Sequence, residues 1–294
     1  MELVTEPSTG PVRAAATVVM LRDAADGLEV FLIKRHGLSD VLGGAYVFPG
    51  GKVDTFDAEL DCDAHLDLQA HALFASLGEA DLDEAQAVAL HVAALREAFE
   101  ETGVLYAHGA DAKAAAMAWE LLREGRGFDE VLAMMSLRLQ ASSLQPWSRW
   151  ITPAVGGVVR KRFDTRFFLA AMPSDQVARH DNHEATESIW LSPREALQQY
   201  WERQIELAPP QIMSIAHLAR HASVASALSE ARLRTPPLIQ PEPFEQDGIR
   251  IICYPGDERH SVRARALPGP TRLHFRDKRF EPVEGLQALL GLPG

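Results

Sequence analysis

Residues 96–104 of this chain read Arg96-Glu97-Ala98-Phe99-Glu100-Glu101-Thr102-Gly103-Val104. On an α-helix, which turns about 100° per residue, Glu100 lies roughly 60° to one side of Glu97 and Glu101 roughly 40° to the other. Three carboxylates on one face repel and raise one another's pKa. A single Arg96 cannot neutralise all three. A hard divalent ion such as Mg²⁺ or Mn²⁺ can, because it prefers oxygen ligands.

The alternative explanation for three glutamates is an acidic helix face in contact with water. The flanking sequence argues against it. The helix is apolar on its other sides, at Ala93, Ala94 and Phe99, so we expect it to pack into a core. It ends at Gly103, a typical helix C-cap. Upstream, residues 48–51 (Phe-Pro-Gly-Gly) form a glycine turn after a short strand, where a backbone can approach a phosphate group.

These residues resemble the signature of the Nudix hydrolases, which reads Gly, five residues, Glu, seven residues, and then Arg-Glu-apolar-x-Glu-Glu-x-Gly-apolar. Residues 96–104 match the second half at every fixed position. Two features depart from the pattern. Five residues after Gly51 comes Asp57, where the family has Glu. The segment that follows, 58–95, has 38 residues in place of seven.

A long helical insertion inside the signature is similar to that of one branch of the family, the peroxisomal coenzyme A diphosphatase type and its bacterial relatives. Three other stretches resemble the same branch, namely 48–54 (FPGGKVD), 150–153 (WITP) and 162–168 (RFDTRFF). The resemblance covers residues 12–230, and nothing past Thr235 resembles a known segment.

Strands and helices alternate along the whole chain, which indicates an α/β or α+β fold. The resemblance implies a Nudix-type α/β/α sandwich with a mixed sheet. We expect the Nudix domain to span 12–233, with one insertion at 58–95 and a helical one at 110–139. We hypothesise that these insertions cap the site and select the substrate. Residues 234–294 are rich in proline and short strands, and we predict a β-rich extension of unknown role.

Apolar and β-branched runs predict strands, and longer apolar periodicity predicts helices. The expected strands cover 14–22, 30–35, 45–48, 145–152, 162–171, 188–191 and 249–254. The expected helices cover 65–77, 82–102, parts of 110–139, 193–201 and 214–233.

The resemblance also implies roles for individual residues. Glu97, Glu100 and Glu101 would hold the metal ions, and Arg96 would orient these glutamates through an ion pair. The general base differs between branches of the family. Our candidate for an added base or ligand is Glu184, with Glu187 in the same loop as a second choice. The alternative is that both are ordinary loop carboxylates.

Substrate binding is expected at the glycine turn and at nearby cations. Gly50 and Gly51 would approach the phosphates through their backbone. Arg35, Arg160 and Arg162 would act as charge-assisted donors to phosphate. Side chains alternate along a strand, so Arg160 and Arg162 share a face. The alternative for these arginines is solvated charge at strand ends.

The leading hypothesis is a divalent-metal-dependent hydrolase of a phosphoanhydride bond in a nucleoside diphosphate linked to another moiety. Resemblance favours coenzyme A or acyl-CoA, cleaved to 3′,5′-ADP and (acyl)phosphopantetheine. ADP-ribose, NADH and sugar nucleotides are the alternative substrates. A non-catalytic nucleotide-binding regulatory module is the alternative from another class, although the three signature glutamates are intact.

Composition restricts the partners. The net charge of −12 argues against nucleic acid, because phosphate backbones favour clustered Lys and Arg. The two cysteines, Cys62 and Cys253, have no metal-ligand spacing and are expected to be free thiols. No apolar run has the length of a signal peptide or a membrane span, so we expect a soluble, cytoplasmic protein. Dimerisation is common in the family, and a homodimer is left open.

Overall fold

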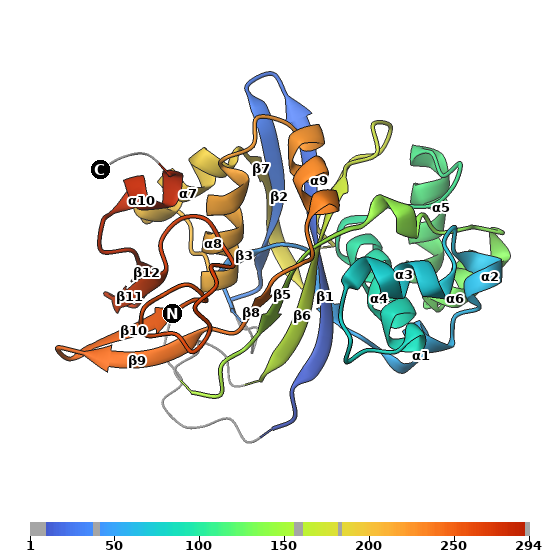
Figure 1. The fold of residues 1–294 in the computed structure, drawn as a ribbon. Coiled ribbons are helices and arrows are strands. Elements are labelled where there is room, and N and C mark those ends of the chain that lie inside the picture. The colour runs from blue at the N-terminus through green and yellow to red at the C-terminus, as the bar shows by residue number, and fades with distance from the viewer. Residues whose placement is uncertain (1–9, 38–41, 156–160, 182–183, 292–294) are drawn as a thin grey trace.

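The computed structural model describes residues 10–37, 42–155, 161–181 and 184–291. At its centre is an eight-stranded mixed sheet with helices against both faces (Figure 1). A smaller four-stranded antiparallel sheet is formed by the C-terminal part of the chain. The α/β sandwich and the β-rich C-terminal region predicted from the sequence are both confirmed.

The main sheet is built on a parallel pair of strands from distant parts of the sequence. Its strands are β1 (Arg13–Ala24), β2 (Gly27–Arg35), β3 (Tyr46–Val47), β4 (Gly50–Lys52), β5 (Gln145–Ile151), β6 (Phe163–Ala171), β7 (Ala185–Leu191) and β8 (Leu238–Ile239). They follow the order β3-β2-β1-β6-β5-β8, with β4 paired to β1 and β7 paired to β2. β1 is antiparallel to its hairpin partner β2 and parallel to β6.

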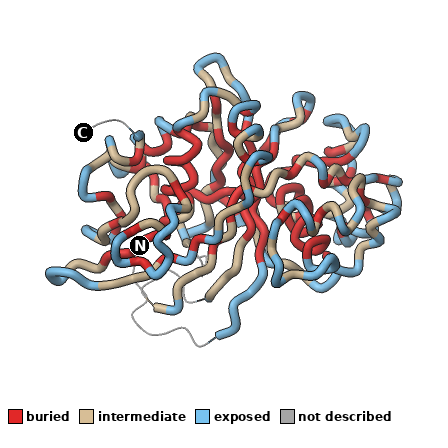
Figure 2. The backbone as a smooth tube through the Cα atoms, in the orientation of Figure 1, coloured by how far each residue is buried: buried red, intermediate tan, exposed pale blue. Residues whose placement is uncertain are grey.

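The two faces of the sheet bury two separate apolar cores. Successive side chains of a strand point to opposite faces. In β1, Val18 and Met20 enter one core, while Val19 and Leu21 enter the other. Buried segments accordingly lie on both sides of the central strands (Figure 2).

Each core is covered by its own group of helices (Figure 1). On one face lie α1 (Thr55–Glu59), α2 (Cys62–His65), α3 (Ala70–Leu77), α4 (Glu84–Thr102), α5 (Ala112–Arg123) and α6 (Phe128–Met134), with a 3₁₀ turn at Ala141–Ser143. On the other lie α7 (Pro193–Trp201), α8 (Pro209–Leu218) and α9 (Val224–Leu233). Within the described ranges, no helix is both long enough and apolar enough to cross a membrane.

The helix α4 has the ends that its sequence predicts. At its start, the side chain of Asp83 accepts a hydrogen bond from the backbone N–H of Gln86. At its end, Gly103 adopts the left-handed conformation with φ of 70°, which costs glycine little. The signature residues therefore occupy the last two turns of a long buried helix.

Two of the expected helices are interrupted. The predicted helix 214–233 is wrong as a single element, because α8 ends at Leu218 and α9 begins only after Ser223, whose hydroxyl caps the new helix. The predicted helix 65–77 is likewise divided. There, Leu66 forms a β-bridge with Leu139, which takes its backbone out of the helical path.

The C-terminal region packs on the main domain. Its strands are β9 (Glu242–Gln246), β10 (Ile249–Cys253), β11 (Arg272–Arg276) and β12 (Arg279–Glu281), followed by α10 (Leu286–Leu290). Ile252, Tyr254 and Phe280 belong to the same apolar core as α7–α9. The division of the chain at residue 233 stays a prediction, and this shared core shows that the two parts are in close contact.

Candidate active site

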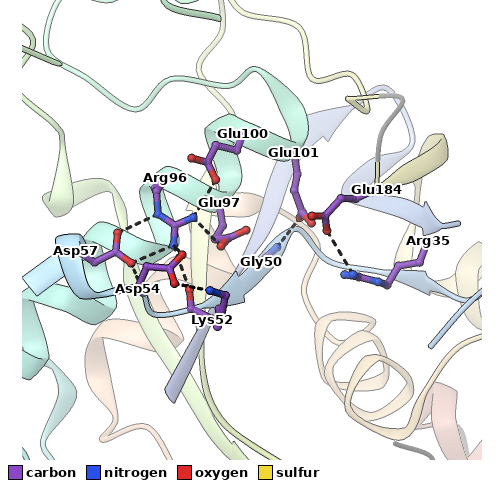
Figure 3. A network of polar contacts seen from close by, with 10 residues as sticks. All are labelled: Arg35, Gly50, Lys52, Asp54, Asp57, Arg96, Glu97, Glu100, Glu101 and Glu184. Carbon is purple, nitrogen blue, oxygen red and sulfur yellow. Dashed lines mark hydrogen bonds and ion pairs between the residues drawn. The ribbon is translucent and has the colours of Figure 1, made fainter. Parts of the chain in front are cut away.

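A buried arginine at the end of α4 organises the carboxylates of the signature (Figure 3). Arg96 is only 2% exposed. Its Nε and Nη2 donate to the two oxygens of Asp57 at 2.9 and 3.0 Å. Its Nη1 donates to Glu97 at 2.7 Å and to Glu100 at 2.8 Å. One buried cation therefore fixes the positions of three carboxylates.

Asp57 has a structural place in this network. Asp57 is completely buried. Besides the hydrogen bonds from the guanidinium of Arg96, its carboxylate accepts one from the backbone N–H of Asp54 at 2.8 Å, and this bond caps the start of α1. The shorter acid that replaces the family's usual Glu therefore keeps a two-bond ion pair with Arg96. Because it stands just before the 58–95 insertion and Arg96 just after it, this pair joins the two ends of the insertion.

The glycine turn supports the signature glutamates from the other side. The backbone N–H of Gly50 donates to Oε2 of Glu101 at 2.7 Å. A Cβ at Gly50 would lie 2.4 Å from the carbonyl oxygen of Ala16, and a Cβ at Gly51 would lie 2.5 Å from Oε1 of Glu97. At Gly50 the clash is with backbone and φ is 154°, so this position requires glycine. At Gly51 a side chain would displace the carboxylate of Glu97.

Negative charge is in excess at this point. Burial raises the pKa of Glu97 to about 7, even though Arg96 acts to lower it. Burial also raises the pKa of Glu101 well above its ordinary value, and the nearby charge of Glu97 raises it further. A cation bound between such carboxylates would offset both effects. The donors are all oxygen atoms, which suits a hard divalent ion.

Glu184 approaches the same glutamates from the loop before β7. Its carboxylate lies on the Glu101 side of the network (Figure 3) and contributes to the raised pKa of both Glu97 and Glu101. Its own ion-pair partner is Arg35, at 3.4 Å. Glu187, by contrast, pairs with Lys34 at 3.4 Å and does not line the pocket described next.

A pocket of about 530 Å³ opens beside the glycine turn. Among the residues predicted for the site, its wall contains Arg35, Gly50, Gly51, Glu97 and Glu184. This volume suits a small organic ligand.

The basic segment before β6, where arginines were predicted to bind phosphate, contributes Lys161 to the pocket wall. Arg160 lies outside the described residues. Nε of Arg162 donates to the backbone oxygen of Thr152 at 3.1 Å, and the side chain does not line the pocket. The neighbouring Lys161 does line it. A phosphate contact from Arg162 stays a prediction.

Sequence reasoning did not identify much of the pocket wall. The additional lining residues include Trp150, Phe167, Gln211, Ile252 and Phe280. Four of these five are apolar or aromatic, and in a sequence such residues cannot be distinguished from ordinary core. Trp150 and Phe167 are indeed also part of the buried core, at 4% exposure each.

Among the described residues, one group of three possible metal ligands has its ligand atoms within 4.8 Å of one another, and it lies away from this pocket, at the junction of α8 and α9. The carboxylate of Glu230 is 2.8 Å from Nε2 of His217 and 3.0 Å from Nε2 of His221. The guanidinium of Arg234, 3.5 Å from Glu230, already supplies positive charge there, and it also lies over the ring of Trp147. We therefore assign this cluster to the packing of α8 and α9 against β5.

Comparison with known proteins agrees with the geometry. A model of the NUDT19 Nudix domain matches residues 9–218. The chain is 28% identical over 237 residues to the acyl-coenzyme A diphosphatase NUDT19 of Xenopus laevis, covering 67% of this chain and 61% of the relative. It is 28% identical over 240 residues to the human protein of the same name, covering 68% and 63%. The chain thus spans about three fifths of the length of these relatives.

The fold has a counterpart among solved structures. A NUDIX hydrolase from Alicyclobacillus acidocaldarius superposes with a TM-score of 0.60 at 27% identity, over 75% of this chain and 97% of that one. The sequence signature, the buried Arg96 network and the match over residues 9–218 lead to one conclusion. The chain belongs to the Nudix hydrolase family and is of the NUDT19 type.

Proposed function

We propose that this protein hydrolyses a phosphoanhydride bond in a nucleoside diphosphate linked to another moiety, and that it does so with a divalent metal ion. The observation that supports this best is the position of Glu97. Its carboxylate is held by Arg96, rests against the backbone of Gly51 and faces a pocket of about 530 Å³.

Glu97, Glu100 and Glu101 would hold the ion, which we expect to be Mg²⁺ or Mn²⁺. The fit is chemical, because buried carboxylates in excess over nearby cations need a counter-charge. Such an ion lowers the pKa of water and neutralises charge on the diphosphate.

The chain's own residues position the reactants. Arg96 keeps Glu97 and Glu100 in fixed orientations, and the Gly50 N–H does the same for Glu101. Because Gly51 has no side chain, the carboxylate of Glu97 can lie against its backbone at the wall of the pocket. Arg35 is the charge-assisted donor for a phosphate oxygen. Glu184, which is well exposed and faces the same pocket, is the candidate to accept a proton from the attacking water.

For the substrate we propose coenzyme A or an acyl-CoA, cleaved to 3′,5′-ADP and (acyl)phosphopantetheine. The support is the similarity to two proteins named acyl-coenzyme A diphosphatase. We further propose that the protein acts on small molecules and not on nucleic acid, in keeping with its net charge of −12.

The test is product analysis after incubation with Mg²⁺ or Mn²⁺ and a panel of CoA, acetyl-CoA, ADP-ribose, NADH and a sugar nucleotide. Two matched pairs of variants accompany it. Glu97→Gln is paired with Glu84→Gln, at the exposed start of the same helix. Glu184→Gln is paired with Glu187→Gln, on the same segment but bound to Lys34.

We expect 3′,5′-ADP as a product from CoA. The rate of hydrolysis should fall about a hundredfold or more in Glu97→Gln and should stay near the wild-type rate in both control variants. Cleavage of another panel member alone would refute the CoA assignment but keep the hydrolase. Nucleotide binding without any cleavage would refute the hydrolase and favour a non-catalytic binding module.

A further inference from the structure

The C-terminal extension reaches the wall of the pocket. β8 runs parallel to β5 at the edge of the main sheet, with Ile239 in register with Trp150. The chain then continues through Pro241 into the small sheet. Pro241, Ile252 on β10 and Phe280 on β12 all line the pocket. All three lie beyond residue 218, where the match to the family model ends.

An unbroken row of aromatic rings connects the glycine turn to this extension. Phe48, just before the turn, packs edge-on against Phe167 with ring centroids 6.3 Å apart. Phe167 contacts Trp150 at 6.2 Å, and Trp150 contacts Tyr254 at 5.9 Å. Three of these rings (Phe48, Phe167 and Trp150) also line the pocket. The apolar surface is therefore continuous with the backbone that approaches Glu97.

The two parts of the wall differ in polarity. The charged lining residues come from β1, β2, β4, α4, the segment before β6 and the loop before β7. The start of α8 and the C-terminal extension contribute no charged residue from the described chain. Their lining residues are Ala208, Pro209, Pro210, Gln211, Pro241, Ile252 and Phe280.

Gln211 is the polar exception in that part. It is 6% exposed, and its Oε1 is buried with no hydrogen-bond partner in the described structure. An unpaired buried amide oxygen costs free energy. Because the Gln211 side chain lines the pocket, turning its amide toward the cavity would let this oxygen accept a hydrogen bond from a bound N–H or O–H group and would remove that cost.

We propose that the start of α8 and the C-terminal sheet form a subsite for the group attached to the diphosphate, and that this group is an extended, mainly apolar chain with an N–H or O–H donor. An acylated pantetheine arm has this chemistry. A sugar does not, because most of its hydroxyls would be desolvated against apolar residues without partners. The inference rests on the proposed hydrolase, since it takes the diphosphate to bind at the glycine turn.

The proposed subsite places substrate selection in the C-terminal extension and not in the insertions at 58–95 and 110–139. In the described structure, the pocket wall includes no residue of the 58–95 insertion and none of 110–139. Those segments belong to the core on the opposite face of the sheet. The extension, whose role was unknown from the sequence alone, is thereby assigned a role in substrate binding.

Neighbouring residues on β10 provide a matched pair of variants. Ile252 and Ile251 are both buried, at 3% and 1% exposure, but only Ile252 lines the pocket. Ile252→Ala and Ile251→Ala therefore remove the same atoms from opposite faces of one strand. Their kcat/KM values would be compared for octanoyl-CoA and for ADP-ribose. Binding of phosphopantetheine would be measured separately by calorimetry, so that one readout does not depend on turnover.

We expect Ile252→Ala to lower kcat/KM for octanoyl-CoA about tenfold relative to ADP-ribose, and Ile251→Ala to leave that ratio unchanged. Gln211→Leu should weaken phosphopantetheine binding about threefold to tenfold without lowering thermal stability, because it removes an unpaired buried oxygen.

The inference would be overturned, with the hydrolase left intact, if Ile252→Ala and Ile251→Ala changed the ratio of kcat/KM values equally and Gln211→Leu left phosphopantetheine binding unchanged. Turnover of ADP-ribose by a protein that binds no phosphopantetheine would overturn it as well. Phosphopantetheine binding that depends on Ile252, in a protein that cleaves nothing, would keep the subsite and refute the proposed hydrolase.

Discussion

Replacing Arg96 by Gln should destabilise the protein far more than replacing an exposed arginine. Arg96 is 2% exposed, Asp57 is fully buried, and two hydrogen bonds of 2.9 and 3.0 Å join them. Removing one partner of such a pair leaves an uncompensated buried charge, which costs about 3 to 5 kcal/mol. Glu97 also loses its cation, at a position where burial already raises its pKa to about 7.

The assay is urea unfolding at pH 7, read as a change in midpoint at constant slope. The control is Arg203→Gln, whose partner Asp277 lies 3.2 Å away with both side chains well exposed. Surface pairs of this kind contribute less than about 1 kcal/mol. In a thermal scan, the expected loss for Arg96→Gln corresponds to a drop of roughly 5 to 10 °C for a chain of this size.

A second variant separates charge from packing. Asp57→Asn in the Arg96→Gln background removes the stranded carboxylate, so the double variant should be more stable than the sum of the two single changes predicts. If Arg96→Gln costs no more than Arg203→Gln, or if the two changes are simply additive, the reasoning about the buried network is refuted.

Three further predictions concern single positions. Gly51→Ala places a Cβ 2.5 Å from the carboxylate of Glu97, so turnover should fall about tenfold or more. Gly10→Ala, whose Cβ would meet no described residue within 4 Å, should match wild type, and equal rates in the two variants would contradict the prediction. Burial lowers the pKa of His91 from 6.5 to about 4, so the unfolded chain takes up the extra proton and stability falls as pH drops across that range. In urea unfolding at pH 7 and pH 4.5, His91→Leu should reduce this loss by up to about 3 kcal/mol, and an unchanged pH dependence would count against it. Asp57→Glu adds a methylene to a fully buried site and should cost about 1 to 3 kcal/mol in the same assay, so an equally stable variant would show that the site has spare room.

Local patterns predicted the elements that carry the signature. The helix expected over 82–102 is α4, from Glu84 to Thr102, because both of its ends carry capping residues that act locally. The strand expected over 162–171 is β6, from Phe163 to Ala171. The glycine turn and the three glutamates were identifiable for the same reason, since each depends on a few adjacent residues.

What could not be predicted depends on contacts between distant segments. Nothing local indicates that Leu66 pairs with Leu139 and so interrupts a helical pattern. The pocket wall raises the same difficulty, because Ile252 and Phe280 have the sequence character of core residues. Their place beside the glycine turn follows from the pairing of β8 with β5, which joins residues about 90 positions apart.

The ion pair between Asp57 and Arg96 also bears on how this branch of the family can change its length. The pair fixes the two ends of a 38-residue excursion at one point of the structure. Closing a flexible loop becomes only slowly more costly as it grows, by about 0.6 kcal/mol for each doubling in length. The excursion is not such a loop throughout, because α3 and the first part of α4 bury side chains in the core. Changes in length at little thermodynamic cost are therefore expected only in the connections between its helices, while the junction keeps the signature glutamates in place.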